Sequence, residues 1–264
     1  MVKSEEVLIQ SVDTDGFLTL TLNRPKRLNA LDPELLYALD GAVKKAAEAS
    51  DLNGIILTGA GGHFCAGGDV FIMKEAVDAR NIDALSPFLA ILEQTAHTLF
   101  TCPLPTLCLL DGIVAGAGIG LALSADIRIA TEETRCHFAF PALGAIPDAG
   151  SSYFLPRIIG YHRTMEFYIK NEPLDAATGL AWGLYHEVAA REAIPKRVVF
   201  WKERMAALAP KGFGLSKELF RQALHHALKD QVDAEYFAQL TAMKSEHFYR
   251  KVTELTAKKD KGNA

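Results

Sequence analysis

Two glycine-rich turns carry the backbone groups with which this chain could do chemistry. The turn over residues 111–120 has glycines at positions 112, 116, 118 and 120, follows an apolar strand and leads into an apolar helix that begins near Ala117. The first N–H groups of a helix have no partner within it, and glycine removes the side chains that would keep a ligand away from them. We therefore interpret the Ala117 N–H as a hydrogen-bond donor for a ligand.

The second turn, over residues 59–70, has the same build. It follows an apolar run, is dense in glycine, and leads into a predicted helix that Asp69 is placed to cap. The residues just before Asp69 can again present free N–H groups. No Gly-Lys-Ser or Gly-Lys-Thr follows, which excludes a nucleotide P-loop here. His63 and Cys65 would allow a base and a nucleophile, although no third residue is placed to orient them.

Asp148 is an acid among apolar neighbours, framed by Pro147 and Gly150. One interpretation makes it the N-cap of the helix that follows. The other places its carboxyl group in an apolar cleft, where desolvation raises basicity and prepares the group to move a proton. The residues alone leave both interpretations open.

The glycines of the 111–120 turn also fit structural roles without a ligand. Residues 104–125 are apolar enough to suggest a membrane span, but Pro105, Asp111 and four glycines argue against one. The glycine spacing also fits poorly to the Gly-x-Gly-x-x-Gly of dinucleotide folds. Close packing of a buried helix would account for the same glycines, and this interpretation stays open beside a donor site. The basic turn of Arg24, Lys26 and Arg27 could likewise meet phosphates or be a solvated turn.

The elements that must position these residues alternate between strands and helices up to Gly160. A hairpin is predicted over 7–11 and 17–22, and a helix capped by Asp32 is predicted from Pro33 to residue 50. A further helix is predicted over 81–100, and further strands are predicted over 54–58, 106–110, 127–130 and 135–140. Beyond Gly160 we predict helices only, at 161–170, 175–182, 192–208, 213–228 and 233–256, and a disordered tail over 258–264.

Composition limits the class of protein. The chain has 264 residues, of which 49% are hydrophobic, so it can bury a sizeable core as a soluble globular protein. A net charge of −4 provides no broad cationic surface for nucleic acid. The four cysteines show no metal spacing, and the N-terminus lacks the apolar core of a signal peptide. We expect a cytoplasmic protein that binds neither nucleic acid nor membrane.

Several of these segments together carry a family resemblance. They are Asn23-Arg24-Pro25 with Asn29-Ala30-Leu31, Phe64-Cys65-Ala66-Gly67-Gly68-Asp69, Asp111-Gly112 with Ala115-Gly116-Ala117-Gly118, Ala125-Asp126-Ile127, and Ile146-Pro147-Asp148 with Leu155-Pro156-Arg157-Ile158-Ile159-Gly160. In their order and spacing across roughly residues 7–190 they resemble the crotonase (enoyl-CoA hydratase/isomerase) superfamily.

The resemblance implies an α/β fold, a spiral of ββα repeats with a C-terminal helical oligomerisation region. We expect a core with the acyl-CoA site over residues 1–195 and a helical trimerisation region over 196–264, giving a homotrimer or a dimer of trimers. The implied ligand is an acyl-coenzyme A thioester, and no cofactor is implied beyond the coenzyme A of the substrate. The implied oxyanion hole consists of the backbone N–H groups of Ala66 and Ala117, because a thioester enolate needs two fixed donors.

The same resemblance implies a set of substrate-binding residues. Those at the nucleotide end of coenzyme A are Arg27, Leu28 and Ala30, and those along the pantetheine channel are Gly68, Asp69 and Val70. Aromatic residues that could form an acyl pocket, although core packing accounts for them equally well, are Phe64, Phe71, Phe140, Tyr153 and Phe154.

Departures from the family pattern narrow the expected reaction. Hydratases of this family carry two glutamates, and an ungapped comparison places Gly120 and Phe140 at those positions. Asp148 falls where isomerases carry an acid. We therefore expect an isomerase that shifts a double bond with Asp148 as acid and base. The alternatives are a hydratase or thioester hydrolase in which Asp148 directs water, and a non-catalytic acyl-CoA-binding subunit.

Overall fold

The computed structural model describes residues 6–225 and, beyond them, residues 230, 236–239, 241, 243 and 248. The chain divides into two compact units, Met1–Met205 and Ala206–Ala264. The domain boundary predicted after residue 195 falls within helix α9 (Ile194–Ala206), and the assignment of a trimerisation region stays a prediction. Most of the helix predicted over 233–256, and the whole tail over 258–264, lie outside the described residues.

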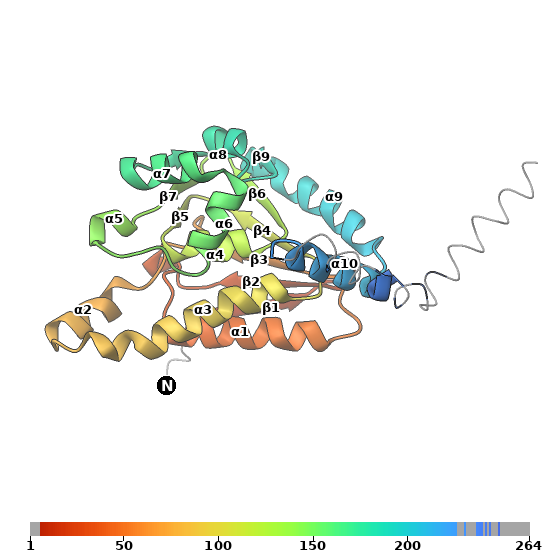
Figure 1. The fold of residues 1–264 in the computed structure, drawn as a ribbon, viewed down its shortest axis with the longest axis horizontal. Coiled ribbons are helices and arrows are strands. Elements are labelled where there is room, and N and C mark those ends of the chain that lie inside the picture. Colours follow the sequence, from red (N-terminus) through yellow and green to blue (C-terminus); the bar gives the residue numbers. More distant parts are fainter. Residues whose placement is uncertain are drawn as a thin grey trace, which may run out of the picture. The chain divides into compact units, whose positions relative to one another are not determined.

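A six-stranded sheet forms the centre of the first unit (Figure 1). Its strands, in spatial order, are β1 (Leu8–Val12), β2 (Phe17–Leu22), β3 (Gly54–Gly59), β4 (Thr106–Leu110), β6 (Ile127–Thr131) and β9 (Glu187–Ala189). The β1–β2 pair is antiparallel, which confirms the predicted hairpin, and the other pairs are parallel.

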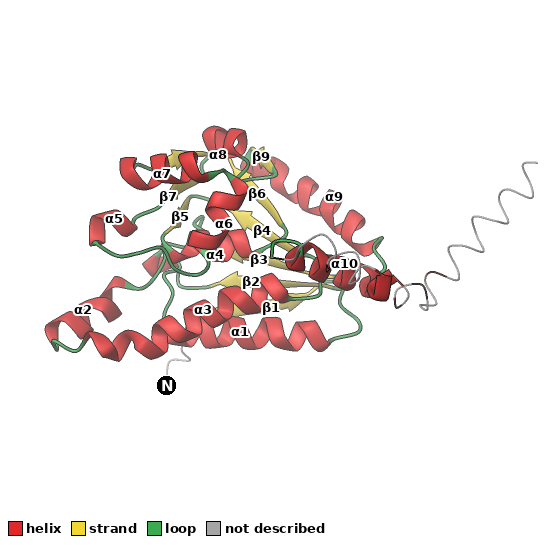
Figure 2. Cartoon of the chain, viewed as in Figure 1, coloured by secondary structure: helices red, strands yellow, loops and turns green. Residues whose placement is uncertain are grey.

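Alternate side chains of the strands enter two different cores. On one face Leu20, Leu57 and Leu110 join the main core with helices α1 (Pro33–Glu48), α3 (Ser86–Thr101) and α4 (Ala117–Ser124). On the other face Ile56 and Ile129 pack with apolar residues of α9. Both faces of the sheet are thus covered, and Figure 2 shows helices around the strands. Strands that are buried on both faces are apolar along their whole length.

The predicted local signals for α1 are confirmed. Pro33 opens the helix, and the Asp32 side chain accepts a hydrogen bond from Leu35 N at 2.8 Å. Helix α3 begins later than predicted, at Ser86, because residues 82–85 form a 3₁₀ turn, η2 (Ile82–Leu85), before a proline in the first turn of α3. Helices α1 and α3 pack side by side (Figure 1).

A smaller sheet of β5 (Ile113–Ala115), β7 (Arg135–His137) and β8 (Leu174–Asp175) lies beyond the main one. The strand predicted over 135–140 stops early, because Ala139 adopts a left-handed φ of 60° and the chain turns into α5 (Phe140–Leu143). The prediction of no strand after Gly160 is wrong, since β8 and β9 are real. Strands of two or three residues are too short to show a period in the sequence.

The first unit has several further helices. They are η1 (Pro25–Arg27), α2 (Val70–Asp78), α6 (Ser151–Ile158), α7 (Tyr161–Lys170), α8 (Ala176–Trp182) and η3 (Arg191–Ala193), and the second unit contains α10 (Pro210–Gln222). No helix among the described residues has both the length and the apolar character to cross a bilayer.

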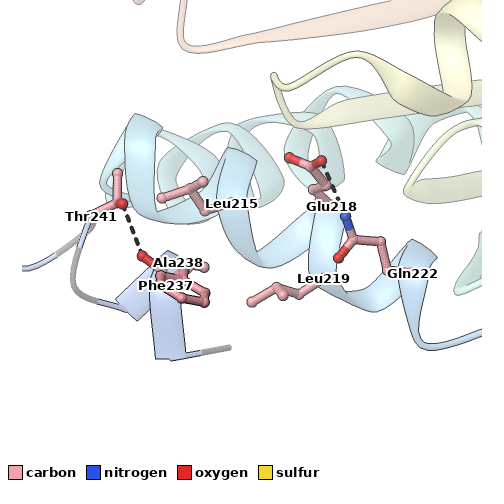
Figure 3. Close-up of a pocket in the computed structure, with 7 residues that line it drawn as sticks. All are labelled: Leu215, Glu218, Leu219, Gln222, Phe237, Ala238 and Thr241. Carbon is pink, nitrogen blue, oxygen red and sulfur yellow. Dashed lines mark hydrogen bonds between the residues drawn. The ribbon is translucent and has the colours of Figure 1, made fainter. Parts of the chain in front are cut away.

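The second unit contains a cavity of about 260 Å³. It lies between α10 and the described residues of the segment 236–241, as Figure 3 shows with Leu215 and Phe237 facing it. The Gln222 amide donates to Glu218 Oε1 at 3.3 Å beside it. None of the predicted site residues lines this cavity, so the chemistry has to be sought in the first unit.

Candidate active site

The first turn of α4 is the place where the predicted site segments meet. A Cβ atom added to Gly67 would lie 3.3 Å from Ala117 N, so the 59–70 turn runs directly against the start of α4. A Cβ atom added to Gly120 would lie 2.2 Å from Ala149 O, so the segment that carries Asp148 rests on the same helix. Glycine at positions 67 and 120 is what permits both close approaches.

The prediction that Ala66 offers a free N–H is wrong. The Ala66 N–H donates to Leu28 O at 3.0 Å. A backbone donor that is already paired within the protein has no hydrogen left for a ligand oxygen. Sequence comparison could locate the turn, but the direction of each N–H depends on which neighbouring segment it pairs with.

The N–H of Gly68 points away from the segment with which its neighbours form hydrogen bonds. Leu31 forms a parallel bridge with Gly68 by donating to Gly67 O and accepting from Asp69 N, which turns the N–H of Gly68 to the opposite side. Within the described part of the chain no hydrogen bond engages the N–H of Gly68. The 59–70 turn therefore holds one open donor, shifted by two residues from the predicted one.

The N–H of Ala117 is open, and its use by a ligand stays a prediction. Ala117 is the first residue of α4, so its N–H has no partner inside the helix. Gly116 before it has a φ of 50° and its own N–H donates to His137 O, which fixes the entry to the helix. Over the described residues, Ala117 N–H makes no hydrogen bond. Each of the two glycine turns thus holds an open donor, and the turns run against one another at the start of α4.

Asp148 presents a carboxyl group with an unused oxygen. The side chain is half-buried, and its Oδ1 is buried without a hydrogen-bond partner among the described residues. Burial raises the pKa of Asp148 from 3.8 to about 7, with a further contribution from the negative charge of Glu93. A carboxyl group with a pKa near neutrality can both take and give a proton.

The cap interpretation of Asp148 is wrong. Helix α6 has Gly150 as its N-cap residue, and no side chain caps its N-terminus. It is the Asp148 carbonyl, not its carboxyl group, that accepts from Ser151 N at 2.9 Å and from Ser151 Oγ at 2.7 Å. The carboxyl group is therefore left without the structural role that the sequence allowed.

Glu93 was missed in the sequence. It lies on the exposed face of α3, and its Oε1 accepts a hydrogen bond from Ala149 N at 3.1 Å. No local pattern distinguishes this glutamate from other polar residues on an amphipathic helix. Only the approach of a segment 56 residues further along the chain brings it to the site.

The predicted coenzyme A residues at 27–30 lie on and after η1. Arg27 is exposed, and its guanidinium group lies 3.9 Å above the ring of Phe71. Leu28 is exposed, whereas Ala30 is buried. The carbonyl groups of Leu28 and Ala30 serve the protein, since they accept from Ala66 N and from the Arg24 guanidinium. Contact of these residues with coenzyme A stays a prediction.

The residues predicted along the pantetheine channel, 68–70, differ in their exposure to solvent. Val70 is exposed, and Gly68 is partly exposed. Asp69 is buried, caps α2 by accepting from Phe71 N at 3.0 Å, and pairs with Arg24 at 2.9 Å. The predicted capping role of Asp69 is thus confirmed, and its carboxylate is committed to holding the turn.

The predicted aromatic pocket is only partly accessible. Phe64 is fully buried in the main core, and Phe140 is 6% exposed with its ring edge-on to Phe138 at 5.3 Å. Core packing therefore accounts for Phe64 and for most of Phe140. Phe71, by contrast, is half exposed.

The alternative nucleophile of the 59–70 turn is not supported. Cys65 is fully buried, and burial raises the pKa of its thiol to about 12. A thiol rather than a thiolate is a weak nucleophile. His63 accepts from Ile113 N through Nδ1 at 3.2 Å, so it holds the turn. Among the described residues no group of three or more metal-ligating side chains occurs.

Comparison with known proteins shows the family of this chain. The model of the family described as enoyl-CoA hydratase/isomerase matches residues 13–261. A protein of Escherichia coli (strain K12) named 1,2-epoxyphenylacetyl-CoA isomerase is 32% identical over 251 residues, which are 92% of this chain and 93% of that protein. The chain belongs to the enoyl-CoA hydratase/isomerase family.

Members of the enoyl-CoA hydratase/isomerase family with other names are also similar. The 4-chlorobenzoyl coenzyme A dehalogenase-2 of Arthrobacter sp is 28% identical over 95% of this chain and 91% of its own length. The crystal structure of an enoyl-CoA hydratase from Bacillus anthracis has a TM-score of 0.87 and 26% identity over 97% of this chain and 96% of that one. The predicted crotonase fold is confirmed, and the chain is an acyl-CoA enzyme. Which reaction it runs depends on the carboxyl groups that it carries.

Proposed function

We propose that this protein is an acyl-CoA isomerase that moves a double bond along the acyl chain. The observation that carries the proposal is Asp148, a half-buried carboxyl group with a pKa near 7, an unpartnered Oδ1 and no capping role. In the proposed reaction the thioester oxygen lies between the N–H groups of Gly68 and Ala117. Two donors aimed at this oxygen stabilise the enolate and make the neighbouring carbon acidic.

The proposed proton path needs only one carboxyl group. The Asp148 carboxylate takes a proton from C2 of a 3-enoyl-CoA, and the electron pair of that C–H bond moves into a dienolate whose oxygen carries the negative charge. The protonated Asp148 then returns the proton to C4, which leaves a 2-enoyl-CoA. The substrate gains and loses one proton, so no other reactant is required.

Gly120 leaves α4 without the glutamate that the resemblance places there in hydratases. A side chain at this position would overlap Ala149 O, so the segment carrying Asp148 occupies the space that a longer residue on α4 would need. A glutamate at position 120, as in the hydratases, would require the segment that carries Asp148 to move, which supports the proposal. We expect the acyl group to lie beside α2, where Val70 and Phe71 are exposed.

Replacing Asp148 tests the proposal. Asp148→Asn keeps the shape of the side chain but can neither take nor carry the proton, so double-bond migration in a 3-enoyl-CoA should fall by at least about 100-fold. The dissociation constant for a saturated acyl-CoA should stay within about two-fold, because the donors and the coenzyme A contacts are unchanged. Activity is measured as the formation of the conjugated enoyl thioester, and binding is measured by calorimetry.

Products distinguish the alternatives. A 3-hydroxyacyl-CoA from a 2-enoyl-CoA would establish a hydratase, and release of free coenzyme A would establish a hydrolase. Tight binding of several acyl-CoA esters with no product would identify a non-catalytic binding subunit. Each of these results, or full activity in Asp148→Asn, contradicts the isomerase proposal.

A further inference from the structure

The carboxylate of Glu93 has a position that the proposed mechanism does not use. It reaches from α3 to the turn that carries Asp148, where Oε1 accepts from Ala149 N at 3.1 Å. Ala149 is buried and has a φ of 49°, a left-handed conformation that is strained for a residue with a side chain. A hydrogen bond to the N–H of this residue stabilises the strained turn.

The turn is held from two sides. Gly120 of α4 lies directly beneath Ala149 O, and Glu93 of α3 binds the N–H of the same residue. The peptide groups next to Asp148 are thereby clamped between two helices. Oδ1 of Asp148 makes no hydrogen bond to any described residue, and the clamped backbone fixes the point from which this side chain extends.

Glu93 is also the charged group that acts on Asp148. Its negative charge contributes to the raised pKa of Asp148, after the larger effect of burial. The charge of Asp148 in turn makes a small contribution to the raised pKa of the Cys65 thiol, in the 59–70 turn. Helix α4 has no ionisable side chain, and in α6 the guanidinium of Arg157 lies 3.8 Å from the ring of Tyr153.

We propose that Glu93 is a positioning residue for Asp148, which anchors the 147–150 turn through Ala149 N–H and presents its charge to the aspartic carboxyl group. The inference rests on the proposed role of Asp148 as the acid and base. Glu93 touches no reacting atom in this proposal. Its removal changes where Asp148 points and the pH at which Asp148 loses its proton.

Two variants separate the anchor from the charge. Glu93→Gln keeps an oxygen that can accept from Ala149 N but carries no charge, whereas Glu93→Ala removes both. Glu75→Gln is the matched control, because it removes one carboxylate from an exposed position on α2. All are made in the full chain, and circular dichroism shows that each variant is folded.

The pKa of Asp148 is measured directly by carboxyl-carbon NMR in ¹³C-aspartate-labelled protein, with the signal assigned by its loss in Asp148→Asn. Glu93→Gln should bring this pKa below about 7 while burial keeps it above 3.8, and Glu75→Gln should leave it unchanged. Since no turnover is needed, this result holds or fails independently of the isomerase proposal. An unchanged pKa in Glu93→Gln overturns the charge role.

Kinetics and hydrogen exchange test the anchor. In Glu93→Ala, kcat should fall about 10- to 100-fold at unchanged KM for the CoA ester, since small misplacements of a catalytic group have effects of this size. The Ala149 amide should exchange faster with solvent in Glu93→Ala than in Glu93→Gln. Equal exchange and equal kcat in the two variants overturn the anchoring role. Absence of isomerase activity in the unmodified protein, with the NMR shift present, overturns only the proposed function.

Discussion

The carboxyl group of Asp148 has a raised pKa because its surroundings disfavour the charged form. Burial is the larger cause and the charge of Glu93 the smaller one. In the proposed mechanism the first step needs the ionised carboxylate. The fraction of protein in that form therefore controls the rate below the pKa.

This gives a prediction for the pH dependence. The value of kcat/KM for a 3-enoyl-CoA should rise as pH increases through about 7 and then level off, because Asp148 ionises in that range. The measurement is a set of initial rates across the range on either side of neutral pH. A profile that is flat below pH 7 would show that Asp148 is not the base.

The donor at residue 68 is tested by removing its N–H. Gly68→Pro lacks this hydrogen, and loss of one oxyanion donor typically lowers kcat about 10²- to 10³-fold. Gly68→Ala keeps the N–H and serves as control, since its methyl group would press mainly on the flexible end of Met73. The rate of double-bond migration is compared in both variants after their melting temperatures have been checked. Equal rates would exclude the Gly68 donor.

Helix α4 is the element on which the site is assembled. It supplies the Ala117 donor from its first residue, and one turn later Gly120 supports the segment with Asp148. The helix is buried along its whole length, which fixes its position against the main core. A change in α4 should therefore alter both stability and catalysis.

Gly120→Ala tests this role of α4. Its methyl group would lie 2.2 Å from Ala149 O, so the turn has to move, and overpacking of this kind typically costs about 1–3 kcal/mol. Unfolding in urea should show the loss, and kcat should fall with it. Gly41→Ala in α1 is the control, because nothing lies within 4 Å of its new methyl group and alanine favours a helix by about 1 kcal/mol. Equal stability of the two variants would contradict the close contact at Gly120.

At the scale of the whole molecule, the raised pKa of Asp148 makes stability depend on pH. Between pH 3.8 and about 7 the folded chain keeps a proton that the unfolded chain releases. The contribution of Asp148 to the free energy of unfolding therefore falls as pH rises through this range, and it is absent below pH 3.8, where both states are protonated.

Asp148→Asn should remove this dependence. The variant should gain stability relative to the unmodified protein as pH rises, by on the order of 1–4 kcal/mol above about pH 7, since one pKa unit corresponds to about 1.36 kcal/mol. Urea unfolding at about pH 5 and about pH 8, at one protein concentration, measures the difference. If the difference in unfolding free energy between Asp148→Asn and the unmodified protein is equal at both pH values, the pKa of Asp148 is not raised by burial.

The amino-acid sequence by itself determined the order of the main strands and helices and the two glycine turns, because apolar periods, caps and turn residues act locally. It also singled out Asp148 as the candidate acid and base. Tertiary structure decided the rest. The N–H of Ala66 is not open to a ligand because it pairs with Leu28, and Glu93 became a candidate positioning residue because α3 meets the turn at Ala149. Both outcomes depend on which distant segments lie side by side. A hydrogen-bond partner of that kind leaves no trace in the residues next to it, whereas a cap or a turn does.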